Sequence, residues 1–92
     1  MRKPEEEFFP SLDECNDFIE WLAENNHIDL NQVRFRIREL GDGSANYIIT
    51  VEWRKRTKDN PPRADELISQ PDWVIEKWYW DGNVWTAGFW RE

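Results

Sequence analysis

Apolar residues recur at helical spacing near the start of the chain. Between residues 12 and 25 they lie three or four positions apart, and acidic residues occupy the other side. This pattern is typical of an amphipathic helix that buries one stripe. Ser11 is a suitable N-cap, with Glu14 three residues later as in a capping box. The sequence therefore predicts a helix over residues 12–25, preceded by an extended or frayed lead-in over residues 1–10.

The pattern changes to a period of two in the middle of the chain. Within residues 33–40, Val33, Phe35 and Ile37 alternate with arginines, and glycines follow this run. Within residues 47–56, apolar side chains recur at every second position, at Tyr47, Ile49, Val51 and Trp53. A period of two indicates half-buried strands, so these runs predict a hairpin. A five-residue loop sets Phe35 opposite Val51 and is preferred, because a four-residue loop would mismatch both faces. A three-residue loop is the alternative.

The C-terminal part of the chain is rich in tryptophan. Five of the seven tryptophans lie in the segment 73–90, on both sides of Asp81-Gly82-Asn83. Aromatic and β-branched runs that flank such a turn are a strong hairpin signal. In a regular hairpin, one face carries Val74, Glu76, Trp78 and Trp80 with Trp85, Ala87 and Phe89. The other face carries Trp73, Ile75, Lys77 and Tyr79 with Val84, Thr86, Gly88 and Trp90.

Both faces of this predicted hairpin are heavily apolar, which a sheet with one wet side would not be. One explanation is that a helix covers one face while loops and the chain ends cover part of the other. The alternative is that part of one face is an exposed aromatic patch for a partner.

Together these elements predict an α+β fold. One N-terminal amphipathic helix would pack on an antiparallel sheet of about four strands, formed by two hairpins in the order α-β-β-β-β. Prolines indicate a loop after the middle hairpin, and a short helical turn is allowed at residues 64–70. The chain of 92 residues is near the lower end of domain size, so we expect one domain over residues 1–92.

Charge is distributed unevenly along the chain, whose net charge is −7. Residues 1–32 hold nine acids and two bases, residues 33–58 hold three acids and seven bases, and residues 59–92 hold seven acids and three bases. The negative total argues against a general nucleic-acid binder, which needs cations to displace phosphate counterions. The acidic side of the helix is either a solvated face or a docking surface for a basic partner.

The sequence contains no recognisable catalytic or metal-binding motif, so we predict no catalytic residues, metal ligands or cofactor and favour a non-enzymatic protein. Cys15 lies on the apolar stripe of the helix and is predicted to be a buried packing residue. His27 follows the helix, and its favourable interaction with the C-terminal end of the helix dipole explains the residue without a function. Glu76 would be desolvated among aromatic residues, with a structural role as the simpler interpretation. No apolar run is long enough for a membrane span or a signal peptide, so a cytoplasmic location is expected.

The primary hypothesis is a small protein-interaction domain, comparable in role to inhibitors, immunity proteins or adaptors. It would dock a basic partner through the acidic helix and the exposed part of the tryptophan-rich hairpin, and homodimerisation through the same hairpin is a linked hypothesis. The candidate contact residues are Trp73, Tyr79, Trp85, Trp90 and Trp21.

Two other functions stay open. A carbohydrate-binding module would stack sugar rings on exposed tryptophans such as Trp73, Trp85 or Trp90. A phosphate or nucleic-acid binder would use the basic outer face of the middle hairpin, although no aromatic residue of that hairpin interleaves its arginines. These arginines are Arg34, Arg36, Arg38, Arg54 and Arg56.

Overall fold

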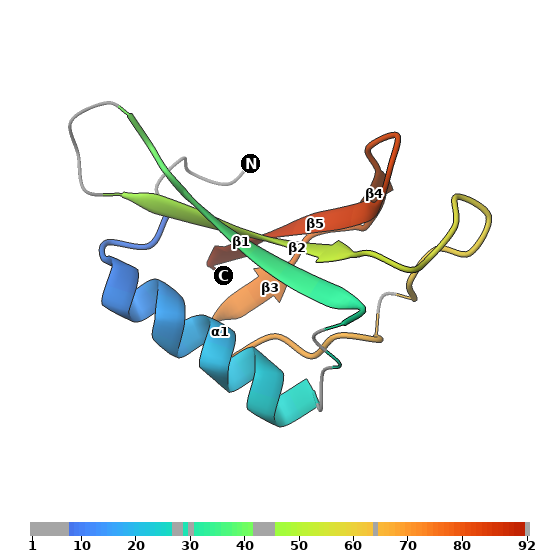
Figure 1. Cartoon of the computed structure of the whole chain (residues 1–92). Coiled ribbons are helices and arrows are strands. Elements are labelled where there is room, and N and C mark those ends of the chain that lie inside the picture. The colour runs from blue at the N-terminus through green and yellow to red at the C-terminus, as the bar shows by residue number, and fades with distance from the viewer. Residues whose placement is uncertain (1–7, 27–28, 30, 42–45, 64, 92) are drawn as a thin grey trace.

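The computed structural model describes residues 8–26, 29, 31–41, 46–63 and 65–91. They form one helix and five strands: α1 (Leu12–Asn26), β1 (Val33–Glu39), β2 (Tyr47–Trp53), β3 (Trp73–Ile75), β4 (Tyr79–Trp80) and β5 (Trp85–Arg91). All strand pairs are antiparallel, in the order β1-β2-β5-β3, and β4 also pairs with β5. The predicted α+β class, with the helix packed on an antiparallel sheet, is confirmed (Figure 1).

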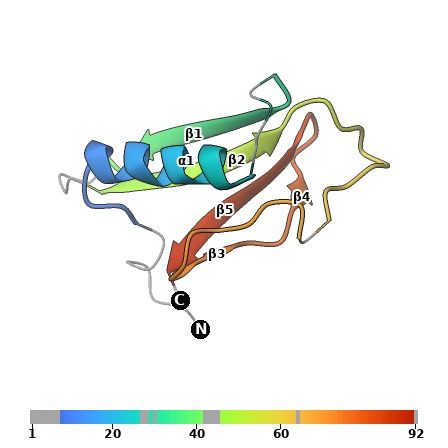
Figure 2. The same ribbon diagram turned by 90° about the horizontal axis from the view of Figure 1, so that it is seen from below.

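The sheet has two distinct faces. The core face carries the buried residues Val51, Ala87 and Phe89, and α1 lies against it. The outer face carries Arg36 and Thr50, which are paired across β1 and β2. Figure 2 shows that α1 runs along β1 and β2 and does not extend over the end of the sheet near β4.

Helix α1 begins and ends through side-chain hydrogen bonds. The Ser11 hydroxyl accepts the backbone N–H of Glu14 at 3.2 Å, which confirms the predicted N-cap. The Asn26 side chain donates to the carbonyl of Leu22 at 2.9 Å and to that of Ile68 at 2.9 Å. It also accepts the backbone N–H of Ile68 at 2.6 Å. The end of the helix is therefore joined directly to the segment before β3.

The pairing of β1 with β2 follows the predicted five-residue loop. Phe35 lies opposite Val51, and the N–H of Leu40 donates to the carbonyl of Asn46 at 3.0 Å. The residues 42–45 of that loop lie outside the described part of the chain. Strand β2 ends at Trp53 rather than continuing to residue 56 as predicted.

The strand predicted before the C-terminal turn is divided by a β-bulge into β3 and β4. In β4, Tyr79 pairs with Thr86, whereas in β3, Ile75 pairs with Phe89. Between these two pairs, three residues of one strand face two residues of β5, and the exposed Lys77 is the extra residue. The predicted set of about four strands is therefore five.

The bulge exchanges the faces expected for β3, because an offset of one residue inverts every side chain. Trp73 and Ile75 pack against the buried core, where a regular hairpin would have placed Val74 and Glu76. Glu76 lies instead beside Gly88, with its Oε2 3.6 Å from where a Cβ at that glycine would be. The predicted face assignment was thus wrong for β3. The prediction that Glu76 lies among the core aromatics was wrong for the same reason.

The turn between β4 and β5 is Gly82-Asn83, within the Asp81-Gly82-Asn83 segment that the sequence indicated. The N–H of Asp81 donates to the carbonyl of Val84 at 3.1 Å, and Gly82 has a φ of 107°, which glycine adopts without strain. Trp80 pairs with Trp85, so the predicted faces hold for the residues next to this turn.

The helical turn allowed at residues 64–70 does not form in the described residues 65–70. Leu67 is buried there, while the backbone of Ile68 bonds to the helix end rather than within a turn of helix. The segment then enters β3 through a tight turn in which the N–H of Trp73 donates to the carbonyl of Gln70 at 3.0 Å. Asp72 has a φ of 75° in this turn, as a type II turn after Pro71 requires.

The core is mainly aromatic. Phe9 is buried, pairs with Tyr47 in an isolated bridge and stacks on Trp73 with ring centres 4.1 Å apart. Phe18 of α1 contacts Phe89 edge to face at 5.0 Å. The predicted lead-in is therefore anchored at Phe9, and its residues 1–7 lie outside the described chain.

Deletion of Lys77 should leave the fold intact. Without this residue, β3 and β4 can join into one regular strand in which Trp78 still faces Ala87 and Ile75 still faces Phe89. We expect a loss of at most about 1 kcal/mol in the free energy of unfolding, measured with urea. Deletion of Tyr79 is the matched control, because it also restores a regular strand but turns Trp78 to the outer face. That variant should lose about 3 kcal/mol or more, and equal losses in the two variants would contradict the assigned bulge.

Candidate functional site

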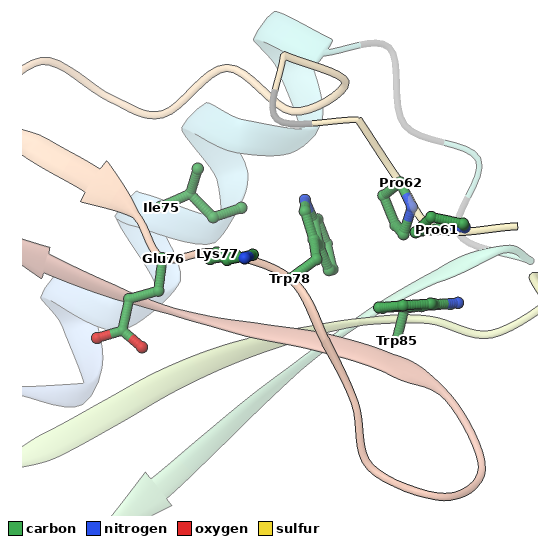
Figure 3. A pocket seen from close by; sticks show the side chains of 7 residues that line it. All are labelled: Pro61, Pro62, Ile75, Glu76, Lys77, Trp78 and Trp85. Atoms are coloured by element: carbon green, nitrogen blue, oxygen red, sulfur yellow. The ribbon is translucent and has the colours of Figure 1, made fainter. Parts of the chain in front are cut away.

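An apolar cleft of about 540 Å³ opens on the core face, and the 54–63 segment forms one of its walls. Pro61 and Pro62 lie opposite Trp78 and Trp85, and Ile75 closes one side (Figure 3). The chain at Glu76 and Lys77 completes the lining, while the Glu76 side chain itself points away from Trp78 and the prolines (Figure 3). The volume falls in the range of about 300–1,000 Å³ that is usual for ligand pockets.

The tryptophans of this cleft are held by their neighbours. Trp85 lies opposite both Trp53 and Trp80 across the sheet, and its indole N–H donates to the carbonyl of Thr57 at 2.7 Å. Trp78 is 7% exposed and meets Trp53 edge to face at 5.8 Å. Its indole nitrogen is buried and has no hydrogen-bond partner among the described atoms. The aromatic wall is thus built in place rather than presented by a mobile side chain.

Arg56 braces the opposite wall. Its guanidinium lies 2.7 Å from a carboxylate oxygen of Glu66, donates to the carbonyl of Pro61 at 3.4 Å and stacks 4.4 Å over the ring of Trp53. Trp53 belongs to the core face, so Arg56 does not join the outer arginine face as expected from the sequence. The reason is that β2 ends at residue 53 and a turn interrupts the alternation.

The other predicted arginines project from the region of β1 and β2. Arg34, Arg36 and Arg38 are exposed on β1, and the Nη1 of Arg36 lies 3.3 Å from Glu52. Arg54 is also exposed, and its N–H donates to the carbonyl of Gln32 at 2.6 Å, which continues the pairing beyond β2. Four of the five predicted basic residues therefore lie along one hairpin.

A second hollow, of about 500 Å³, lies on the outer face. Arg36 and Arg38 line one side of it, and Tyr79 and Asp81 line the other. Tyr79 is 56% exposed and stands next to Thr86 on the neighbouring strand. The sheet order therefore brings an aromatic side chain to the arginine face, which the separate reading of each hairpin did not show.

Asp81 is fixed at the rim of this hollow. Its carboxylate accepts the backbone N–H groups of Asn83 at 2.8 Å and Val84 at 2.9 Å. The hydrogen bond from Val84, followed by that from Asn83, holds the pKa of Asp81 below its usual value. The rim carboxylate is therefore charged at neutral pH.

The five aromatic candidates do not share one surface. Trp85 lines the cleft and Tyr79 lines the outer hollow, whereas Trp73 is stacked in the core. Trp21 packs against the core from α1, and Trp90 lies opposite Val74 on the outer side of the sheet. The cleft adds residues that sequence reasoning missed: Trp78, Pro61 and Pro62. The sequence shows the two adjacent prolines, but it does not show that they lie beside the tryptophans.

The remaining candidates for chemistry from the sequence are Cys15 and His27. Cys15 is fully buried, as predicted, and burial together with the nearby Glu14 raises the pKa of its thiol. His27 lies outside the described part of the chain. No group of three metal-ligating side chains is present among the described residues.

None of the described helical segments has the length and apolar character needed to span a bilayer. Comparison of the chain with protein-family models, with curated proteins and with solved structures finds no match.

Replacing Arg56 with Met should weaken the proline wall, because it removes the partly buried pair with Glu66 and the stacking on Trp53. We expect a loss of about 1–3 kcal/mol in the free energy of unfolding in urea. The matched control is Arg54→Met, since Arg54 is exposed and its change should stay within about 0.5 kcal/mol. Equal effects of the two substitutions would show that Arg56 does not brace this wall.

Proposed function

We propose that the protein is a small non-enzymatic interaction domain that binds an apolar side chain of a protein partner between Trp78 and Trp85. The observation that carries this proposal is the cleft of about 540 Å³ lined by these tryptophans and by Pro61 and Pro62. Tryptophan is enriched among the residues that dominate binding energy, and fixed aromatic walls lose little conformational entropy on binding.

The charge of α1 supports a basic partner. Its outward side presents exposed acidic residues, and no basic residue lies in its last turn. These acids are Asp13, Glu14, Asp17, Glu20 and Glu24. Because α1 and the cleft lie on the same side of the sheet, one partner can meet both. We therefore propose a partner whose apolar anchor is flanked by basic residues, as an inhibitor, immunity protein or adaptor would recognise, and the attraction should be screened by salt.

Two short lysine-rich peptides that differ only in a central Phe or Ala test the proposal. The Phe peptide should bind roughly tenfold more tightly, because burial of a phenylalanine contributes about 1.5–3 kcal/mol. Indole N–H signals followed by NMR should show Trp78 and Trp85 shifting and Trp73 unchanged. The affinity for both peptides should fall as salt is added.

Two variants separate the cleft from the helix. Trp85→Ala should abolish the difference between the peptides, whereas Glu20→Lys with Glu24→Lys should weaken both equally. Equal binding of the two peptides to the unmodified protein would refute the cleft. The same signals report the other hypotheses, since shifts with neutral oligosaccharides would favour carbohydrate binding. Shifts on dilution would favour a homodimer.

The outer hollow supports a second candidate function, the binding of a phosphate or of single-stranded nucleic acid. The observation that favours it is the position of the exposed Tyr79 in the same hollow as Arg36 and Arg38. A base can stack on a tyrosine ring while a phosphate binds the guanidinium groups. Arg36 is already held near Glu52, so Arg38 is the more available cation of the two in this geometry.

Tyr79→Ala should weaken the binding of a short oligothymidylate by about fivefold or more, because a stacked base contributes about 1–3 kcal/mol. Arg38→Glu should weaken it further and steepen the loss with salt. Lys55→Glu, a charge change at an exposed residue of the 54–63 segment, is the control and should have a smaller effect. Fluorescence anisotropy measures all three, and unaltered binding by Tyr79→Ala would exclude stacking in this hollow.

A further inference from the structure

Strand β1 forms one margin of the sheet. It pairs with β2 on one side, and no described strand pairs with its other side. With seven residues it is longer than β3 at the opposite margin, which has three. Figure 2 shows β1 along one border of the molecule. An open strand of this length is a template to which another strand can add.

The hydrogen bonds at its two ends show which residues of β1 face outward. The carbonyl of Gln32 and the N–H of Leu40 both bond toward β2 and its continuation. In an antiparallel pair the bonding residues alternate, so the even-numbered positions face β2. Phe35, Ile37 and Glu39 therefore direct their backbone groups away from the sheet. The N–H of Val33 is already taken by the carbonyl of Asp29 at 3.0 Å, which marks the end of the open stretch.

The side chains of β1 differ strongly between its two faces. Three exposed arginines, Arg34, Arg36 and Arg38, occupy the outer face. Phe35 and Ile37 are half-buried on the core side and pack against the core. A strand added at this edge would therefore meet a row of cations on one face and an apolar strip on the other.

These charges disfavour a second copy of the chain at this edge. Two copies that pair antiparallel through their odd-numbered residues must also place even-numbered residues opposite each other. In every register that sets Phe35 or Ile37 opposite either of these residues in the second copy, an arginine of one copy faces an arginine of the other: with Ile37 opposite itself, Arg36 faces the second copy's Arg38. Like charges directly across a strand pair are destabilising.

We infer that β1 binds an extended acidic segment of a partner protein as an added strand. Acidic side chains at alternate positions would face Arg34, Arg36 and Arg38, which suit carboxylates in paired geometry. Apolar side chains at the positions between would lie beside Phe35 and Ile37, and backbone hydrogen bonds would supply affinity. This edge is separate from the tryptophan cleft and does not depend on the function proposed for it.

A capped seven-residue peptide of alternating Glu and Val is the probe. It should bind roughly tenfold more tightly than a peptide of the same composition with its glutamates in one block, because only the alternating peptide matches the arginine row. Bound peptide should slow hydrogen exchange at the amides of Phe35 and Ile37, which face outward. A peptide with Lys in place of Glu should not bind.

Exchange of charge makes the test specific. The variant with Arg36→Glu and Arg38→Glu changes only exposed side chains, so it should fold, and its preference should switch to the lysine peptide. Tyr79→Ala should leave the binding of the glutamate peptide unchanged, which distinguishes the edge from the outer hollow.

Equal binding of the alternating and blocked peptides, or peptide-induced protection only in the 54–63 segment, would overturn the inference. Concentration-dependent protection of Phe35 in the protein alone would also overturn it in favour of a second copy.

Discussion

One extra residue between β3 and β4 determines how the aromatic C-terminal stretch is used. A regular strand offers only two alternating sides, and here both would have been crowded with aromatic residues. In a regular strand, Ile75 and Trp78 would face opposite sides because they are three positions apart. The bulge lets both of them face the core. It also turns Glu76 to the outer face, beside Gly88. The core below β3 and the side of the tryptophan cleft that Ile75 closes both follow from this single offset.

The aromatic residues perform two different tasks in this small chain. Near α1, Phe9, Phe18, Trp73 and Phe89 pack ring against ring and supply buried area where few residues are available. At the end that α1 does not cover, Trp78 and Trp85 lie across the cleft from the prolines of the 54–63 segment. The first group closes the fold, whereas the second leaves a hollow. The abundance of tryptophan therefore has two explanations, one in the core and one in the cleft.

Patterns that act locally could be predicted from the sequence, and those that depend on long-range pairing could not. Apolar spacing and the Ser11 cap placed the helix to within one residue, and charge matching identified the register of Phe35 opposite Val51. The bulge leaves no mark in the alternation, because either face could accept an aromatic side chain. The placement of Tyr79 and Arg36 around one hollow depends on β2 lying next to β5, which neither hairpin encodes alone.

The Asn26 side chain has a consequence for any partner that meets both α1 and the cleft. It pairs with the backbone of Ile68 as one strand pairs with another, and Glu66, two residues earlier, holds Arg56 against Pro61. A chain of short polar contacts thus runs from the end of the helix to the proline wall. Surfaces joined in this way are ordered before an encounter, so little further conformational freedom is lost when they are occupied. The rigidity that these polar contacts give to the helix end and the proline wall, rather than the area of contact, would then determine the affinity of this small domain for a partner.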